Sequence, residues 1–349
     1  MRSLAVSLAL VCTLFSCSHR DPGRAQDWRS GGFDTLGKYN GASIAIGHDG
    51  MLSVLLQDGN ALAFVHCKDS KCEAFDVTRL PDIRQETQSA YLALPDVLLH
   101  DRKAGVITFL RCGDEACRSS REVLTKPFPY EVVEAGKTVW GAKLLSANGG
   151  TEFVTLQCNP SCVLQRTCGR LPAAPFMGVV AEEDLWSAIQ PTGGAVSIYR
   201  CDRPVWTAND SAATVRGTAS SGNAAWFALV QTDAIRLVRC AEASCEPRGV
   251  LQAANAKFLT TTGVPTPMLA FASEDTLYFA RCADPECKSL GATTIGRGLP
   301  LSVAAAPDGT VWIAYTEPDA DVYELAHCLD AGCSSVQTVS LPQPGLAAR

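Results

Sequence analysis

Residues 276–287, TLYFARCADPEC, join an alternating apolar run to a small loop that is closed by two cysteines. Alternation of apolar and polar side chains is typical of a half-buried β-strand. The same combination returns along the chain as ALAFVHCKDSKC, GVITFLRCGDEAC, AIRLVRCAEASC and VYELAHCLDAGC. A strand followed by a cysteine-closed loop is therefore the repeated unit of this protein.

The first cysteine of each unit gives the period. These cysteines stand at positions 67, 112, 158, 201, 240, 282 and 328, at intervals of 45, 46, 43, 39, 42 and 46 residues. Periods of 40–50 residues indicate propellers or helical arrays. Further short apolar runs flank each cysteine strand, polar turns such as QDGN, SANGGT and ASED separate them, and helical periodicity is missing. The sequence therefore predicts four strands per unit, the blade of a β-propeller.

We predict an all-β fold over residues 41–342: a seven-bladed β-propeller with four antiparallel strands per blade. The expected blades cover residues 41–82, 83–127, 128–172, 173–212, 213–254, 255–297 and 298–342, and residues 343–349 form a C-terminal tail. In each blade the cysteine loop joins the third strand to the fourth, and the acidic residue two places after the first cysteine supplies turn chemistry. These residues are Asp69, Asp114, Glu242, Asp284 and Asp330. A disulfide at the base of that hairpin stabilises its free edge strand by about 2 kcal/mol.

The N-terminus predicts export. Arg2 precedes an apolar run at 4–15, which is too short to span a bilayer and reads as a signal peptide over residues 1–16. The tetrapeptide LFSC at 14–17 resembles the lipobox of bacterial lipoproteins, which implies that Cys17 carries a diacylglycerol. Residues 17–40 then form a polar tether. We expect a protein of the bacterial outer membrane, periplasmic or at the cell surface, that contacts the membrane only through its lipid; soluble secretion is the alternative.

The remaining cysteines predict disulfides. With Cys12 in the signal and Cys17 lipidated, fourteen of the 16 cysteines are left, an even number that suits an oxidising compartment. The expected local pairs are Cys67–Cys72, Cys112–Cys117, Cys240–Cys245, Cys282–Cys287 and Cys328–Cys333. Cys158, Cys162, Cys168 and Cys201 leave two choices open: Cys158–Cys162 with Cys168–Cys201 between neighbouring blades, which is the simplest, or a Cys158–Cys168 bond.

A looser resemblance concerns the stretch PDGTVWIAY at 307–315, which is echoed in GKTVWGA and EDLWSAI. It resembles blades of Asp-box, sialidase-like propellers, and the repeat is similar to that of bacterial lipoproteins built from CxxxxC hairpins. Only Asp308, Gly309, Thr310 and Trp312 approach the Asp-box. The resemblance implies an alternative function as a secreted carbohydrate-active enzyme, which would need clustered arginines, a Tyr–Glu pair and an Asp.

Other candidate sites are weaker. Each cysteine loop lacks a second thiol pair, so zinc is not expected. A loop with Glu317, Asp319 and Asp321 offers oxygen ligands for calcium, although a solvated acidic turn is favoured.

The basic residues before the first cysteines are expected to form local hairpin ion pairs: His66, Arg111, Arg200, Arg239, Arg281 and His327. Trp140, Trp186, Trp226 and Trp312 occupy equivalent second-strand positions, where core packing is favoured over a sugar platform.

The composition and the motifs of the chain argue against several classes of function. A net charge of −6 without a basic run argues against nucleic acid as a partner. No G-x-S-x-G motif occurs, so serine hydrolase chemistry is not expected. We expect a non-catalytic binding scaffold without a cofactor, recognising a protein or a glycan. A scaffold like the eight-bladed lipoprotein of outer-membrane protein insertion is disfavoured by blade count and disulfides. Carboxylates with arginine or tyrosine at the channel mouth would favour an enzyme, whereas Ser, Ala and Thr there would argue against one.

Overall fold

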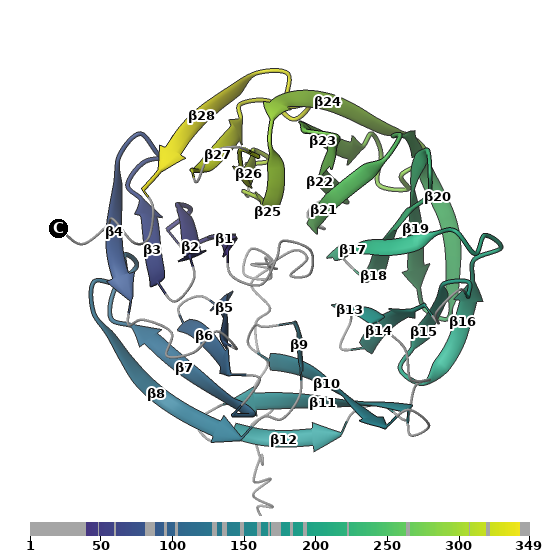
Figure 1. Ribbon diagram of the computed structural model, residues 1–349, viewed down its shortest axis with the longest axis horizontal. Helices are drawn as coiled ribbons and strands as arrows, with labels where there is room; N and C mark the ends of the chain where they lie inside the picture. Colours follow the sequence, from purple (N-terminus) through teal and green to yellow (C-terminus); the bar gives the residue numbers. More distant parts are fainter. Residues whose placement is uncertain are drawn as a thin grey trace, which may run out of the picture.

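The computed structural model describes residues 40–342 except 48, 59–60, 81–87, 94–95, 102–103, 128–130, 135–137, 147–149, 159–161, 167, 169–175, 182–183, 191–193, 222, 263–265, 307 and 319–321. The predicted signal peptide, Cys17 and nearly all of the predicted tether lie outside the described residues. Within them, 28 strands form seven four-stranded antiparallel sheets that surround a central axis (Figure 1). The described part of the chain contains no helix long and apolar enough to cross a membrane.

The sheets are numbered 1 to 7 in chain order. Sheet 1 contains β1 (Asn40–Ile46), β2 (Leu52–Asp58), β3 (Ala61–Cys67) and β4 (Phe75–Leu80); sheet 2 contains β5 (Gln88–Ala93), β6 (Asp96–Asp101), β7 (Val106–Cys112) and β8 (Ser120–Pro127). Sheet 3 contains β9 (Glu131–Glu134), β10 (Thr138–Ser146), β11 (Gly150–Cys158) and β12 (Cys162–Arg166); sheet 4 contains β13 (Phe176–Ala181), β14 (Asp184–Ile189), β15 (Ser197–Arg200) and β16 (Arg203–Thr207). Sheet 5 contains β17 (Thr214–Ser221), β18 (Ala224–Val230), β19 (Ala234–Ala241) and β20 (Ser244–Gln252). Sheet 6 contains β21 (Ala256–Thr262), β22 (Met268–Ser273), β23 (Thr276–Cys282) and β24 (Leu290–Arg297); sheet 7 contains β25 (Leu299–Ala305), β26 (Val311–Thr316), β27 (Tyr323–Cys328) and β28 (Val336–Leu341).

Each sheet is a four-stranded meander in which the first strand is innermost and the fourth outermost (Figure 1). Burial follows this order. Every residue of β18 is buried, because sheets pack on both of its faces, whereas β24 at the rim is mostly exposed. This explains why the second strands are continuous apolar runs such as AAWFALV and VWIAYT, while the fourth strands are polar.

The ring closes by packing rather than by exchange of a strand, since each sheet is built from consecutive strands. Buried residues of sheets 1 and 7 form one hydrophobic core, which includes Ile44 and Leu325. The amide of Ile44 lies 3.4 Å from the acceptor Ser302 Oγ, and the Tyr323 hydroxyl donates to the Gln57 carbonyl at 2.8 Å. The predicted all-β architecture of repeated four-stranded antiparallel sheets is confirmed.

Candidate functional site

Disulfides close the loops between third and fourth strands, as the repeat predicts. The structure contains Cys67–Cys72, Cys112–Cys117, Cys240–Cys245, Cys282–Cys287 and Cys328–Cys333. It also contains the Cys168–Cys201 bond, which joins sheet 3 to sheet 4. Cys158 and Cys162 face each other across the β11–β12 ladder, but their side chains lie outside the described residues. The pairing of Cys158 with Cys162 therefore stays a prediction.

In four of these loops the second cysteine has a left-handed backbone. Cys72, Cys117, Cys287 and Cys333 have φ values of 55°, 50°, 51° and 56°. This region costs an L-residue free energy unless the surroundings hold it there. In each loop the second cysteine's amide donates to the carbonyl of the Asp that follows the first cysteine by two positions, as in Cys333 to Asp330 at 3.0 Å. The disulfide and this hydrogen bond together hold the turn.

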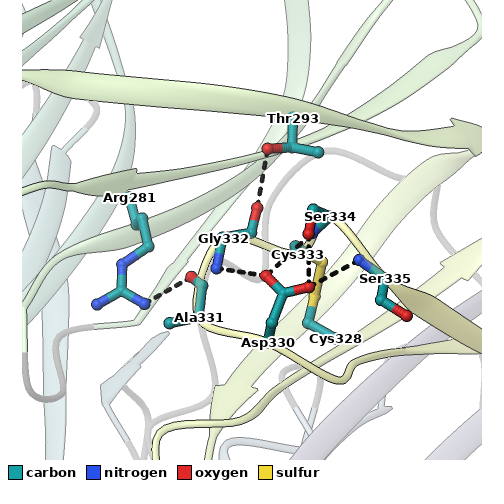
Figure 2. Close-up of a disulfide and its surroundings, with 9 residues drawn as sticks. All are labelled: Arg281, Thr293, Cys328, Asp330, Ala331, Gly332, Cys333, Ser334 and Ser335. Atoms are coloured by element: carbon teal, nitrogen blue, oxygen red, sulfur yellow. Dashed lines mark hydrogen bonds between the residues drawn. A yellow bond between two sulfur atoms is a disulfide. The ribbon is translucent and has the colours of Figure 1, made fainter.

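The Asp side chain organises the rest of the loop. Asp330 accepts hydrogen bonds from the amides of Gly332, Ser334 and Ser335 at 2.8, 3.1 and 2.8 Å, and from the Ser334 hydroxyl at 2.7 Å (Figure 2). The hydroxyl and amide of Ser334, followed by the other amides, lower the pKa of Asp330 to about 2. Asp69 accepts from three loop amides in the same way. These acidic residues therefore serve the loop itself, as their turn chemistry predicts.

Three of the basic residues before the first cysteines have partners outside their own cysteine loops, so the expected hairpin ion pair is wrong for these three. His66 Nε2 lies 3.1 Å from Asp49 Oδ2 in the turn between β1 and β2. Arg200 Nε donates to Asp184 at 2.8 Å, at the equivalent turn of sheet 4. Arg281 reaches the Ala331 carbonyl of the next sheet at 2.5 Å (Figure 2). These three side chains thus reach a turn of their own sheet or the loop of the next sheet.

The tryptophans of the second strands lie in the core, as expected. Trp186, Trp226 and Trp312 are almost fully buried and belong to three different clusters of apolar residues. The side chain of Trp140 lies outside the described residues. His327 stacks on Trp312 with ring centroids 3.9 Å apart, and neither of its ring nitrogens has a hydrogen-bond partner in the part of the chain that the structure describes. Burial lowers the pKa of His327, an effect that Asp308 opposes.

A hydrogen-bonded tyrosine–glutamate pair is present in sheet 7. The Tyr315 hydroxyl donates to one oxygen of Glu324, and the Ser340 hydroxyl donates to the other at 3.4 Å. Burial, followed by Glu324, raises the pKa of Tyr315. The hydrogen bonds of Glu324 thus join β26, β27 and β28.

The candidate calcium loop is described only at one end. Glu317 is partly buried, and Asp319 and Asp321 lie outside the described residues. Across the described ranges no group of three or more His, Cys, Asp or Glu side chains is placed to hold a metal ion. Calcium at this loop stays a prediction.

The innermost strands consist largely of small and hydroxyl-bearing residues. NGASIAI, TVRGTASS, AKFLTTT and LPLSVAA are the sequences of β1, β17, β21 and β25. Ser43, Ser220, Thr260 and Ser302 on these strands are buried. Among the seven innermost strands that the structure describes, only β9 carries carboxylic acids, Glu131 and Glu134. Four of the seven innermost strands are thus rich in Ser, Ala and Thr, whereas the two carboxylic acids of this set lie together on β9.

Comparison with known proteins supports the fold alone. No family model matches the chain, and no curated protein matches it either. Solved structures do: a putative 6-phosphogluconolactonase from Bacteroides fragilis is 9% identical, covers 88% of this chain and 96% of its own, and has a TM-score of 0.55. Its counterpart from Bacteroides uniformis is 12% identical, with 87% and 96% covered and a TM-score of 0.53. A protein from Lactobacillus plantarum is 11% identical, with 80% and 91% covered and the same TM-score of 0.53.

Proposed function

We propose that this protein is an exported, lipid-anchored, seven-bladed propeller that acts as a non-catalytic scaffold of the bacterial cell envelope. The observation that carries the proposal is the set of disulfide-closed loops around the rim, with the repeated sheets between them. Disulfides in such number belong to an oxidising compartment. A covalently stapled ring keeps its loops in fixed positions, so a partner can be bound with little loss of conformational freedom.

We assign the binding surface to the face opposite the cysteine loops, where the second strands turn into the third. The polar groups of the cysteine loops are engaged in the loops' own hydrogen bonds, as Asp330 and Asp69 show. On the opposite face the turns carry exposed acidic residues, among them Asp233, Glu274 and Asp275. A protein partner with a basic surface, or a glycan held by hydrogen bonds, fits this face.

The anchor is tested with an alkyne analogue of palmitate fed to bacteria that express the full-length chain. We expect the wild-type protein to take up the label and to fractionate with membranes. Cys17→Ala should lose the label and leave the membrane fraction, whereas Cys12→Ala is the matched control and should behave as wild type. A labelled Cys17→Ala protein, or an unlabelled wild-type protein in the medium, would contradict the anchor and favour soluble secretion.

The scaffold role is tested by binding and turnover on the purified oxidised protein. We expect capture of one glycan class on an array, or of one envelope protein after cross-linking in intact cells, without release of product from any bound sugar. The alternative, a secreted carbohydrate-active enzyme, depends on the acids of β9. Hydrolysis of a bound glycan that disappears in Glu131→Gln or Glu134→Gln would overturn the scaffold proposal.

A further inference from the structure

In sheets 1, 2, 5, 6 and 7 the cysteine loop contacts the sheet before it in the ring. The Thr293 hydroxyl of β24 donates to the Gly332 carbonyl, in the loop of sheet 7, at 2.8 Å (Figure 2). The Thr78 hydroxyl of β4 donates to the Ala116 carbonyl, in the loop of sheet 2, at 2.9 Å. The two threonines stand eleven positions after the first cysteine of their own sheets, and both acceptors stand four positions after the first cysteine of the next. The contact therefore belongs to the repeat and is not an accident of one pair of sheets.

A second contact also joins one sheet to the loop of the next sheet. It comes from the arginine that precedes the first cysteine. Arg281 of sheet 6 donates to the Ala331 carbonyl in the loop of sheet 7, and Arg200 of sheet 4 donates to the Glu242 carbonyl in the turn of sheet 5. Guanidinium groups make strong, directed hydrogen bonds to such acceptors. Each of these loops is thus held by a side chain that the preceding sheet supplies.

Charged and amide side chains add contacts at other boundaries. Asp76 of sheet 1 pairs with Arg118, which follows the disulfide of sheet 2. At the closure of the ring, Gln337 of sheet 7 donates to Glu73 of sheet 1 at 3.4 Å; these two residues occupy the same repeat positions as the previous pair. Arg248 of sheet 5 lies 3.4 Å from Glu286 in the loop of sheet 6.

Close packing also joins the outer strand of sheet 5 to the cysteine loop of sheet 6. A Cβ atom at Gly249 of β20 would lie 3.1 Å from the Cys287 carbonyl oxygen and 3.2 Å from the Cys287 sulfur. A glycine in this rim strand therefore lets the neighbouring disulfide approach the backbone closely. The disulfide itself, and not only its loop, contacts the preceding sheet.

Between sheets 3 and 4 the contact is covalent. Cys201 occupies the turn between β15 and β16, the place of the cysteine loop in the other sheets, and it bonds to Cys168, which follows β12 of sheet 3. The bond has the same direction as the hydrogen bonds: the turn of one sheet is attached to the outer part of the sheet before it. Sheet 4 lacks a local disulfide because its cysteine serves this boundary.

We propose that the cysteine loops are clasps between neighbouring sheets, so that oxidation of the cysteine pairs closes and locks the ring. Each clasp is the loop of one sheet held by the third or fourth strand of the preceding sheet, and Cys168–Cys201 is its covalent form. A dithiol reductant that gives two electrons and two protons to such a disulfide leaves two thiols and itself becomes a disulfide. Reduction then frees the loop and loosens the sheet before it. A disulfide that is only a hairpin staple would affect its own sheet alone.

Hydrogen–deuterium exchange on the full-length oxidised protein separates these two roles. In the variant Cys328→Ser with Cys333→Ser we expect faster exchange in the loop of sheet 7 and also in residues 290–297, the outer strand of sheet 6. Loss of one hydrogen bond of ordinary net strength predicts roughly fivefold faster exchange there. Faster exchange confined to sheet 7 would overturn the clasp.

A second variant keeps every cysteine and so avoids a folding defect. Thr293→Val removes the hydroxyl that donates to Gly332 but keeps the shape and strand preference of the side chain. We expect it to speed exchange in residues 290–297 and, reciprocally, in 328–335. Thr294→Val, at the exposed neighbouring position, is the matched control and should leave both segments unchanged. If the two valine variants behave alike, the clasp does not exist.

The covalent clasp has its own test. Cys168→Ser with Cys201→Ser should speed exchange in both β12 and the β15–β16 hairpin, which lie on either side of the boundary. The other disulfides remain in place and serve as an internal reference. Unchanged exchange on the sheet 3 side would show that the bond has no clasping role.

Discussion

The loops of sheets 5 and 7 have the same C-x-x-x-x-C spacing and different backbones. In sheet 7, β27 ends at Cys328 and β28 begins at Val336, with the Asp330-centred loop between them. In sheet 5 the ladder continues through the cysteines, Cys240 lies directly opposite Cys245, and a two-residue turn with Glu242 at φ 57° closes the hairpin. The acidic residue differs by one methylene, and in sheet 5 the chain forms a tight hairpin instead of the wide Asp-capped loop. The same spacing of the two cysteines gives a disulfide in both sheets. The backbone between them differs: the loop with Asp330 is wide and the turn with Glu242 is tight.

Removal of each disulfide should give the largest difference between the two sheets. Cys328→Ser with Cys333→Ser leaves a wide loop without its covalent closure, and we expect a loss of about 2–4 kcal/mol. Cys240→Ser with Cys245→Ser leaves a hairpin that backbone pairing still closes, so the loss should be smaller. Urea unfolding of the two variants beside wild type measures both. Equal losses would mean that the ladder of sheet 5 adds nothing to its disulfide.

The carboxylates give a smaller contrast. Asp330→Ala removes the acceptor of the hydrogen bonds from Gly332, Ser334 and Ser335 and should lower the urea midpoint clearly, whereas Glu242→Ala should leave it near wild type. The pKa of Asp330 is depressed from 3.8 to about 2 in the folded protein, so its contribution is complete above pH 4 and is lost as the pH falls toward 2. Unfolding curves between pH 2 and 5 should therefore converge for wild type and Asp330→Ala at the acid end. A constant difference down to pH 2 would exclude the carboxylate as the cause.

Much of this fold follows from the sequence, because the repeat carries strand order and cysteine position together. The apolar second strands, the tryptophans at their equivalent positions and the loop between third and fourth strands could all be predicted from spacing and alternation. The partners of Arg281 and Arg200 could not, since each lies in the next repeat and depends on how neighbouring sheets are oriented. The sequence also did not predict which cysteine loops are wide and which are tight, because Asp and Glu are both acidic residues at the same position of the turn.

The site itself was harder to predict than the scaffold. Candidate ligands such as Glu317, Asp319 and Asp321 are close in sequence, but convergence of side chains around a ring depends on sheet packing and not on chain spacing. The contacts of Thr78 and Thr293 could not be predicted from either stretch alone, because threonines in rim strands are common. One signal was available: both threonines stand at the same distance after the first cysteine of their repeats. Equivalent positions in different repeats, rather than neighbouring positions along the chain, therefore predict these contacts.

The residue before the first cysteine gives the smallest contrast between sheets 5 and 7: Arg239 in one and His327 in the other. His327 is stacked on Trp312 and buried, and its pKa lies below 6.5, mainly because burial disfavours the imidazolium; Lys71 adds to this effect and Asp308 opposes it. As the pH falls below 6.5 the unfolded chain takes up this proton first, so stability is lost on acidification and is complete above that pH. His327→Phe keeps a ring on Trp312 and should remove this part of the pH dependence, while Arg239→Lys, which replaces one cation by another, should leave it intact. Urea midpoints between pH 5 and 7.5 measure the slope. A His327→Phe protein whose midpoint still falls as steeply as that of wild type would assign the dependence to another group.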